Sequence, residues 1–336
     1  KQDDFEKIPG SPIAYWVSNQ TIQNFEKTPI SESSDTREGM ATADNNKFTR
    51  LWYEIDNHNF FIDAVTRELA QDSGKKWFPY ASGGEYRRWF GNHDLIVNWG
   101  NDGFEIRNFK NEKGKVRSHN YNLDLIFQEG LTWTSLSSNN FAIRLMPKGF
   151  LFSGAGTSLF TSKENLMYIL GFLNMSIPYN YLTILNPTLN FTPGNVGKLP
   201  IIFPKKDLIK EQIETLTQQN VSISEEEWDS RETSWDFTKN ELLKHKSDLK
   251  LETAYNNYCS YWKEKFYKLH ANEEELNRLF IDIYELGDEL TPDVDLKDIT
   301  ILKSESIIND RGELEFKADE IMKQFISYAV GVMFGR

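Results

Sequence analysis

The chain has 336 residues, which is enough for two domains that each bury a core. It contains one cysteine, Cys259, which excludes an internal disulfide framework and fits a reducing compartment. No stretch approaches the run of about 20 apolar residues that a membrane helix needs, and no signal segment opens the chain. We therefore expect a cytoplasmic protein without a membrane partner.

The net charge of −12 argues against a simple nucleic-acid-binding protein. The charge is unevenly distributed, however. Residues 205–336 contain 18 Lys and Arg against 29 Asp and Glu, a net charge of −11, whereas residues 75–148 contain 11 against 7, a net charge of +4. This asymmetry predicts two regions with different roles.

Local patterns before residue 75 are mixed. Residues 8–12 have the composition of a turn, and residues 31–39 are typical of a polar loop. Residues 48–69 combine strand-like and helical patterns, so the sequence assigns them to neither class.

From residue 75 to about 200, strands and turns are favoured. One β-hairpin is predicted to join 95–99 to 104–107 through the Asn-Asp-Gly turn at 101–103. A second is predicted to join 141–145 to 150–152 through Pro-Lys-Gly.

A helix is expected after Thr161, which forms a capping-box pair with Glu164. Residues 186–197 are rich in Asn, Pro, Thr and Gly and predict a loop.

Beyond Pro204 the pattern becomes helical. Apolar residues recur at helical spacing through 209–216, 251–269, 276–286 and 321–332. Ser224 and Glu227 predict a capping box, and Asn272 predicts the start of a further helix. The expected fold class is α+β, with a mixed α/β domain followed by a mostly α-helical C-terminal domain.

No group in the sequence has a convincing catalytic pattern. Gly154-Ala155-Gly156 lacks the third glycine of a dinucleotide loop, because position 159 is leucine. Residues 186–189 differ from the Asn-Pro-Pro-aromatic loop of amino methyltransferases at the third and fourth positions. The five histidines have no zinc-ligand spacing, and the acidic triplets at helix starts are explained by the helix dipole. We predict no metal site and no catalytic residue in this chain.

The segment 75–121 combines basic and aromatic residues. Residues 83–92 read Gly-Gly-Glu-Tyr-Arg-Arg-Trp-Phe-Gly-Asn, and further basic residues follow between 107 and 117. Arginines can bind phosphates or a guanine edge, and aromatic rings can stack on bases. The alternative is a solvated basic loop beside a core tryptophan, and the residue types alone leave both open.

These residues resemble a known family. Several segments resemble the C-terminal part of PglX-type adenine-specific DNA methyltransferases of BREX phage-defence systems, which are related to type IIG restriction-modification enzymes. These segments are residues 7–16, 44–54, 83–89, 186–191 and 196–201, together with the helices at 276–290 and 325–336. The similarity extends over essentially the whole chain.

The resemblance implies a domain organisation. Residues 1–69 correspond to a linker from a preceding methyltransferase domain, 70–204 to a DNA target recognition domain, and 205–336 to a helical C-terminal domain. The family's S-adenosylmethionine and Asn-Pro-Pro-aromatic motifs would lie in that preceding domain. The chain is therefore expected to be a fragment that holds no cofactor and is inactive alone, whereas the full-length enzyme uses S-adenosylmethionine.

The implied function is sequence recognition for N6-adenine methylation, with double-stranded DNA as the partner and other defence-system subunits as further partners. The alternative is a protein–protein interaction module of a multi-subunit defence complex. The residues that we expect to contact DNA are Tyr86, Arg87, Arg88, Trp89, Arg107, Lys113, Lys115, Arg117, Tyr121, Ser153, Asn186 and Asn190.

Overall fold

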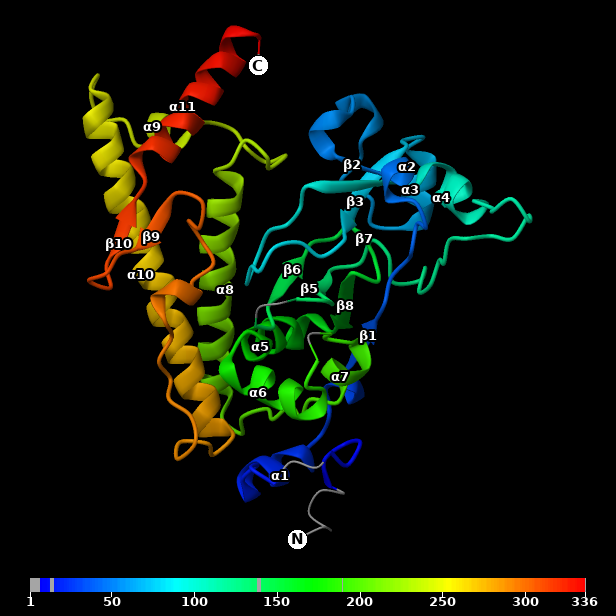
Figure 1. Ribbon diagram of the computed structural model, residues 1–336, viewed down its shortest axis with the longest axis vertical. Coiled ribbons are helices and arrows are strands. Elements are labelled where there is room, and N and C mark those ends of the chain that lie inside the picture. Colours follow the sequence, from blue (N-terminus) through cyan, green and yellow to red (C-terminus); the bar gives the residue numbers. More distant parts are fainter. Residues whose placement is uncertain (1–6, 13–14, 138–139, 189, 336) are drawn as a thin grey trace.

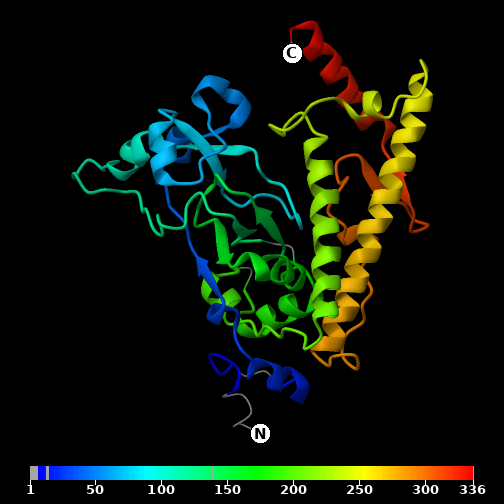
Figure 2. The ribbon, with the colours of Figure 1, turned by 180° about the vertical axis from the view of Figure 1, so that it is seen from behind.

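The computed structural model describes residues 7–12, 15–137, 140–188 and 190–335. Its architecture is α+β, as predicted. Two four-stranded sheets are followed along the chain by a group of long helices, and Figures 1 and 2 show these helices packed beside the sheet-containing part.

The first sheet is fully antiparallel and has the strand order β1-β8-β5-β6. The central strands have buried side chains on both faces, and Leu131, Trp133 and Leu159 are inaccessible to solvent. Its strands are β1 (Ser34–Arg37), β5 (Gly130–Thr134), β6 (Ile143–Met146) and β8 (Gly156–Thr161).

The second sheet has the order β2-β4-β3-β7, in which β3 and β7 are parallel and the other neighbours are antiparallel. Its strands are β2 (Thr49–Leu51), β3 (Trp77–Ala81), β4 (Leu95–Asn98) and β7 (Leu151–Phe152). Three short helices surround it, namely α2 (Asn45–Phe48), α3 (Arg67–Asp72) and α4 (Gly100–Arg107).

The remaining helices lie mostly beside or below the first sheet (Figure 1). They are α1 (Asn19–Phe25), α5 (Lys163–Leu173), α6 (Ser176–Leu185), α7 (Pro193–Gly197), α8 (Asp207–Asp229), α9 (Glu241–Lys244), α10 (Leu251–Ile283) and α11 (Ala318–Met333). Short 3₁₀ turns occupy Ile30–Glu32, Trp52–Glu54, Asn57–Asn59 and Leu296–Asp298, and a small hairpin pairs β9 (Ser306–Ile308) with β10 (Leu314–Phe316).

One hydrophobic core joins the first sheet to the long helices. It contains Trp133 of β5, Ile169 of α5, Ile213 of α8 and Trp262 of α10, all inaccessible to solvent. Burial of such large apolar side chains stabilises the folded state by about 1.5–3 kcal/mol each. The helices therefore share their core with the first sheet, and the boundary near residue 204 stays a prediction from resemblance.

Neither predicted hairpin forms: in the first the expected second strand is a helix, and in the second the strand expected at 150–152 does form but does not pair with β6. Residues 101–103 have the left-handed backbone expected of a turn, but the following residues continue into α4. In the second case β6 and β7 belong to different sheets. Gly149 separates them with φ +94°, and a Cβ there would lie 2.1 Å from the carbonyl oxygen of Ile62, so the chain turns away instead of folding back.

Three capping predictions are also corrected. The helix after Thr161 forms, but Ser162 is its N-cap residue and Thr161 bonds to the carbonyl of Ser33. Glu227 lies inside α8, and Asn272 lies inside the continuous helix α10. Asn272 Nδ2 donates to Asn220 Oδ1 of α8 at 2.9 Å, so this polar residue links two helices and does not begin one.

Helix α11 exposes apolar side chains along much of its length. Ile326, Val330, Met333 and Phe334 are exposed, whereas Ile321 at the start of the helix is buried. In the part of the chain that the structure describes, no helix is both long and apolar enough to span a membrane.

Candidate nucleic-acid interface

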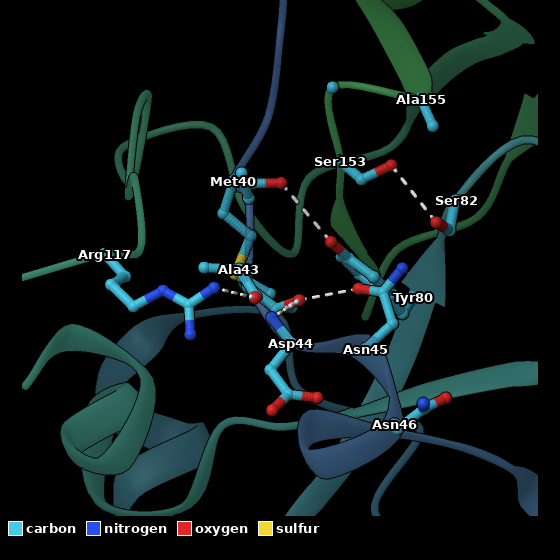
Figure 3. Close-up of a pocket in the computed structure, with 13 residues that line it drawn as sticks. Met40, Ala43, Asp44, Asn45, Asn46, Tyr80, Ser82, Arg117, Ser153 and Ala155 are labelled. Atoms are coloured by element: carbon cyan, nitrogen blue, oxygen red, sulfur yellow. Dashed lines mark hydrogen bonds between the residues drawn. The ribbon is translucent and has the colours of Figure 1, made fainter. Parts of the chain in front are cut away.

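A polar pocket opens beside the second sheet, between the start of α2 and the turn that joins β7 to β8 (Figure 3). Its volume is about 630 Å³. The side chains that give it hydrogen-bonding character are Asp44, Asn45, Asn46, Ser82, Arg117 and Ser153.

Local hydrogen bonds hold the α2 side of the pocket. Asp44 is the N-cap of α2, and its Oδ1 accepts from the backbone N–H of Lys47 at 3.1 Å. Thr42 Oγ1 donates to Asn45 Oδ1 at 2.6 Å, which leaves the amide NH₂ of Asn45 as its other hydrogen-bonding group. Phe48 is fully buried and anchors the helix in the core of the second sheet.

Replacing Asp44 with alanine is expected to lower the free energy of unfolding by about 1 kcal/mol, because the first turn of α2 loses its cap. Urea unfolding monitored by circular dichroism measures this change. Asp282→Ala is a matched control, because Asp282 is exposed in the last turn of α10, where a carboxylate does not favour the helix. An equal loss in both variants would contradict the capping role.

Arg117 stands at the rim of the pocket. One of its Nη atoms donates to the carbonyl oxygen of Ala43 at 3.4 Å, and the guanidinium lies 5.3 Å from the ring centre of Phe109. Figure 3 shows the Arg117 side chain extending toward Ala43 beside Asp44. The guanidinium remains exposed, so its other donors can reach a ligand.

Residues 108–117 form a narrow loop that we call the basic finger. Two backbone hydrogen bonds close it, from Asn111 N to the carbonyl of Lys115 and from Gly114 N to the carbonyl of Asn111, each at 2.9 Å. The side chains of Lys113 and Lys115 are exposed at its tip. Within the described residues neither ammonium group forms an ion pair, so both are available to an anionic partner.

Two further predicted residues flank the finger. Arg107 is exposed, but its Nη1 is paired with Asp102 at 2.6 Å, which reduces its availability to phosphate. Tyr121 is also exposed, and its ring stacks on His119 with centroids 5.5 Å apart. The backbone of His119 pairs with Ala41, which brings this aromatic pair to the pocket.

Three weaker candidates lie along the edge of the molecule that carries the pocket, namely Ser153, Asn186 and Asn190. Ser153 is buried at the floor of the pocket, where its Oγ donates to Ser82 Oγ at 3.3 Å. Asn186 Nδ2 donates to the carbonyl oxygen of Asn190 at 3.1 Å, and Pro187, Thr188 and Asn190 are exposed.

Backbone bonds from Ser135 N to the carbonyl of Ala155, and from Phe191 N to the carbonyl of Ser135, connect this loop to the pocket. The pocket, the turn 153–156 and the loop 186–191 therefore form one continuous edge.

The structure gives a different role to Arg87, Arg88 and Trp89. Arg87 Nη2 is 2.6 Å from Glu227 Oε2 of α8, and Arg88 Nη1 is 2.6 Å from Glu273 Oε2 of α10. Trp89 is fully buried and donates its indole N–H to the other oxygen of Glu273 at 2.7 Å.

This placement corrects the expectation that these three residues contact DNA. Arg87 and Arg88 form ion pairs inside the protein, and the Trp89 indole donates to Glu273. The tryptophan therefore lies in the core, as the alternative interpretation expected, but the two arginines are not solvated as that alternative held. Tyr86 is half-buried, with the Arg88 guanidinium 5.8 Å from its ring, so it belongs to the same internal cluster.

The pKa values of this cluster follow from its burial and its ion pairs. Burial alone would raise the pKa of the Glu227 carboxyl, but the nearby guanidinium groups of Arg87 and Arg231 lower it to about 2. Burial alone would lower the pKa of Arg88, but Glu273 raises it above its ordinary value. The Glu227 carboxyl and the Arg88 guanidinium therefore keep their charges near neutral pH. The two ion pairs connect the loop 84–93 to the long helices.

The pocket does not fit the cofactor of a methyltransferase. Gly154 and Ala155 line it, but they belong to a turn between two strands, whereas a nucleotide-type loop leads from a strand into a helix. Among the described residues, no group of three or more His, Cys, Asp or Glu side chains is arranged to hold a metal ion. The amide, carboxylate, hydroxyl and guanidinium groups of the pocket can hydrogen-bond to a polar ligand.

Comparison with known proteins supports the resemblance found in the sequence. Along its whole length the chain is 38% identical to "Adenine-specific methyltransferase PglX" of Lacticaseibacillus casei (strain Zhang) and 36% identical to "Adenine-specific methyltransferase BrxX" of Escherichia coli O9:H4 (strain HS). The chain is homologous to one region of these adenine-specific methyltransferases. The resemblance to PglX-type enzymes is thereby confirmed.

The chain spans about a quarter of the length of its PglX-type relatives, 27% of the first and 26% of the second. No protein-family model matches it. Among solved structures, the type IIL restriction-modification enzyme MmeI in complex with DNA aligns with 78% of this chain and 37% of its own, with a TM-score of 0.42 and 14% identity.

Sequence reasoning missed Asp44, Asn45 and Asn46 as candidate site residues, although the segment contributed to the resemblance. The available signal was local. An aspartate that caps a short helix places the next two side chains at an exposed helix start, and two adjacent asparagines there are poor helix formers.

Proposed function

We propose that this chain is the DNA sequence-recognition region of an N6-adenine-specific DNA methyltransferase of the BREX phage-defence type. The observation that carries the proposal is the juxtaposition of two kinds of chemistry on one edge of the molecule. Amide, carboxylate and guanidinium groups of the type that read base edges line the pocket, and exposed lysines of the adjoining basic finger suit phosphates.

The overall charge does not oppose this function, because the net negative charge resides mainly in residues 205–336. The basic finger projects from the opposite side of the molecule to α10 (Figure 1). DNA that approaches the finger therefore avoids the most acidic part of the chain. The local field, not the net charge, decides where a polyanion binds.

In this proposal the chain binds and orients DNA, and the methyl transfer belongs to the part of the relatives outside the match. S-adenosylmethionine would supply the methyl group there. The residues of this chain would hold the duplex so that a target adenine can be extruded into that separate catalytic domain.

Replacing both Lys113 and Lys115 with alanine is expected to weaken binding to all duplex sequences alike. If both lysines contact phosphates, the slope of log K against log salt concentration should fall in magnitude by about 0.9 for each lysine removed. Fluorescence anisotropy with a labelled duplex across a salt series measures both quantities.

The double variant Lys263→Ala/Lys268→Ala is the matched control, because both lysines are exposed on α10, far along the chain from the finger. Equal salt slopes for the two double variants would contradict a phosphate role for the finger. Absence of salt-sensitive binding in the unsubstituted chain would sink the proposed function. It would favour the protein-interaction alternative, for which the exposed apolar side chains of α11 offer a surface.

A further inference from the structure

The start of α2 differs chemically from the basic finger beside it. The tip of the finger presents the flexible ammonium groups of Lys113 and Lys115, whereas the pocket at its base is lined by Asn45, Asn46 and Arg117, whose side chains end in planar amides and a planar guanidinium. Planar groups with two adjacent hydrogen-bonding atoms match the paired atoms on base edges. Asparagine matches N6 and N7 of adenine, and arginine matches O6 and N7 of guanine.

The charge at this position also favours a base over a phosphate. Asp44 lines the pocket beside the two asparagines and uses Oδ1 to cap α2. A phosphate brought to the asparagines would be repelled by this carboxylate, whereas the exocyclic amino groups of adenine and cytosine are hydrogen-bond donors that a carboxylate favours.

The helix that carries the two asparagines is anchored to the rest of the protein. Thr42 is buried and fixes Asn45 through the 2.6 Å hydrogen bond, and the fully buried ring of Phe48 packs 5.1 Å from Phe109 at the base of the finger. The backbone of α2, from which Asn46 projects, is therefore held in place, as base discrimination requires.

The side-chain amide of Asn46 is available to hydrogen-bond to a ligand. Its carbonyl oxygen on the backbone accepts from Arg50, but within the described part of the chain its side-chain amide has no hydrogen-bond partner. Figure 3 shows this amide pointing away from the other residues drawn. A capping explanation does not apply to it, because Asp44 is the N-cap residue.

We propose that Asn46 is a specificity-determining residue that reads the major-groove edge of an adenine in the recognised sequence, with Arg117 and Asp44 contacting the neighbouring base pairs. This inference rests on the proposed function, because it requires that the chain bind DNA. It assigns sequence discrimination to the pocket, Arg117 included, and leaves Lys113 and Lys115 at the tip of the basic finger to set affinity.

The test compares the unsubstituted chain with Asn46→Ala by selecting bound duplexes from a randomised library and sequencing them. The expected result is that one adenine position of the selected motif loses its preference by about 5- to 150-fold, the range given by the loss of one bidentate base contact. Affinity for unselected DNA should stay unchanged. Asn256→Ala, an exposed asparagine on α10, is the control and should keep the full motif.

The variant Asn46→Asp provides a second test, in which the expected result is a changed base preference and not a lost one. It replaces the amide donor with an acceptor, so the preference at that position should move from adenine toward cytosine, whose N4 amino group is a donor. An unchanged motif in both Asn46 variants would overturn the inference and leave the proposed function intact. Salt-insensitive or absent binding by the unsubstituted chain would overturn the proposed function and this inference together.

Discussion

Replacing Glu273 with alanine is expected to lower the free energy of unfolding by about 3–5 kcal/mol, the range observed when one partner of a buried ion pair is removed. Glu273 is fully buried in α10. Its two oxygens accept from Arg88 at 2.6 Å and from the Trp89 indole at 2.7 Å. The substitution would leave a buried guanidinium without a counter-charge and a buried N–H without an acceptor. Urea unfolding monitored by tryptophan fluorescence measures the loss.

A control on the same helix separates this effect from a general effect of removing a carboxylate. Glu264→Ala changes an exposed glutamate of α10 and should alter the free energy of unfolding by less than about 0.5 kcal/mol. The double variant Arg88→Met/Glu273→Leu should recover part of the loss, because it removes both charges and leaves apolar side chains of similar size. A double variant that is no more stable than Glu273→Ala would contradict the electrostatic explanation.

The same residues show why sequence reasoning went wrong at the strongest candidate site. Two adjacent arginines beside a tryptophan have the composition of a DNA contact. The composition is the same whether the segment is exposed on the surface or buried in the fold. The carboxylates that bind Arg87 and Arg88 come from positions 140 and 185 residues later in the chain. No local pattern reports such a distant partner, so the sequence alone could not distinguish an ion pair in the core from a phosphate contact.

Elements with strong internal periodicity were predictable. The apolar stripes of α10 and α11, and the apolar face of α5, identified these segments as helical because a packed helix repeats its buried positions at a fixed spacing, although α10 was predicted as two helices. Hairpins were less predictable, because strand pairing is decided between distant segments. The turn residues at 101–103 do turn, yet α4 follows them, where the sequence indicated a second strand.

The candidate interface was predictable in part. Lys113, Lys115 and Arg117 are exposed on one loop, because a short polar hairpin with a glycine at its tip has no means of burying them. The proximity of Arg117 to Asn45 and Asn46 depends on the pairing of Ala41 with His119 and of Met40 with the β7 segment, two contacts that bring together distant parts of the chain. The sequence contains both the basic loop and the segment with Asn45 and Asn46, but it does not show that the two segments are neighbours in the fold.

Acidification should destabilise the chain through Glu227 in particular. Its carboxylate accepts from Arg87 and Arg231 at 2.6 Å each and from the backbone N–H of Leu302 at 3.1 Å. The resulting pKa of about 2 lies below the ordinary value of 4.5. A carboxyl group with a depressed pKa takes up its proton more readily in the unfolded chain, so its contribution is complete above about pH 4.5 and decreases as the pH falls toward 2. Each pKa unit corresponds to 1.36 kcal/mol, which gives a contribution of about 3 kcal/mol.

Comparison of the unsubstituted chain with Glu227→Gln isolates this contribution from that of the other acidic residues. Glutamine carries no charge at any pH, so the variant should be less stable than the unsubstituted chain at pH 7, and the difference should narrow between pH 4.5 and pH 2.5. Urea unfolding at intervals across this range measures the difference, and Glu264→Gln, exposed on α10, should follow the unsubstituted chain throughout. A difference that stays constant with pH would show that the Glu227 carboxylate is not charged against Arg87 and Arg231. In that case these residues would not form the electrostatic connection between the loop 84–93 and the long helices.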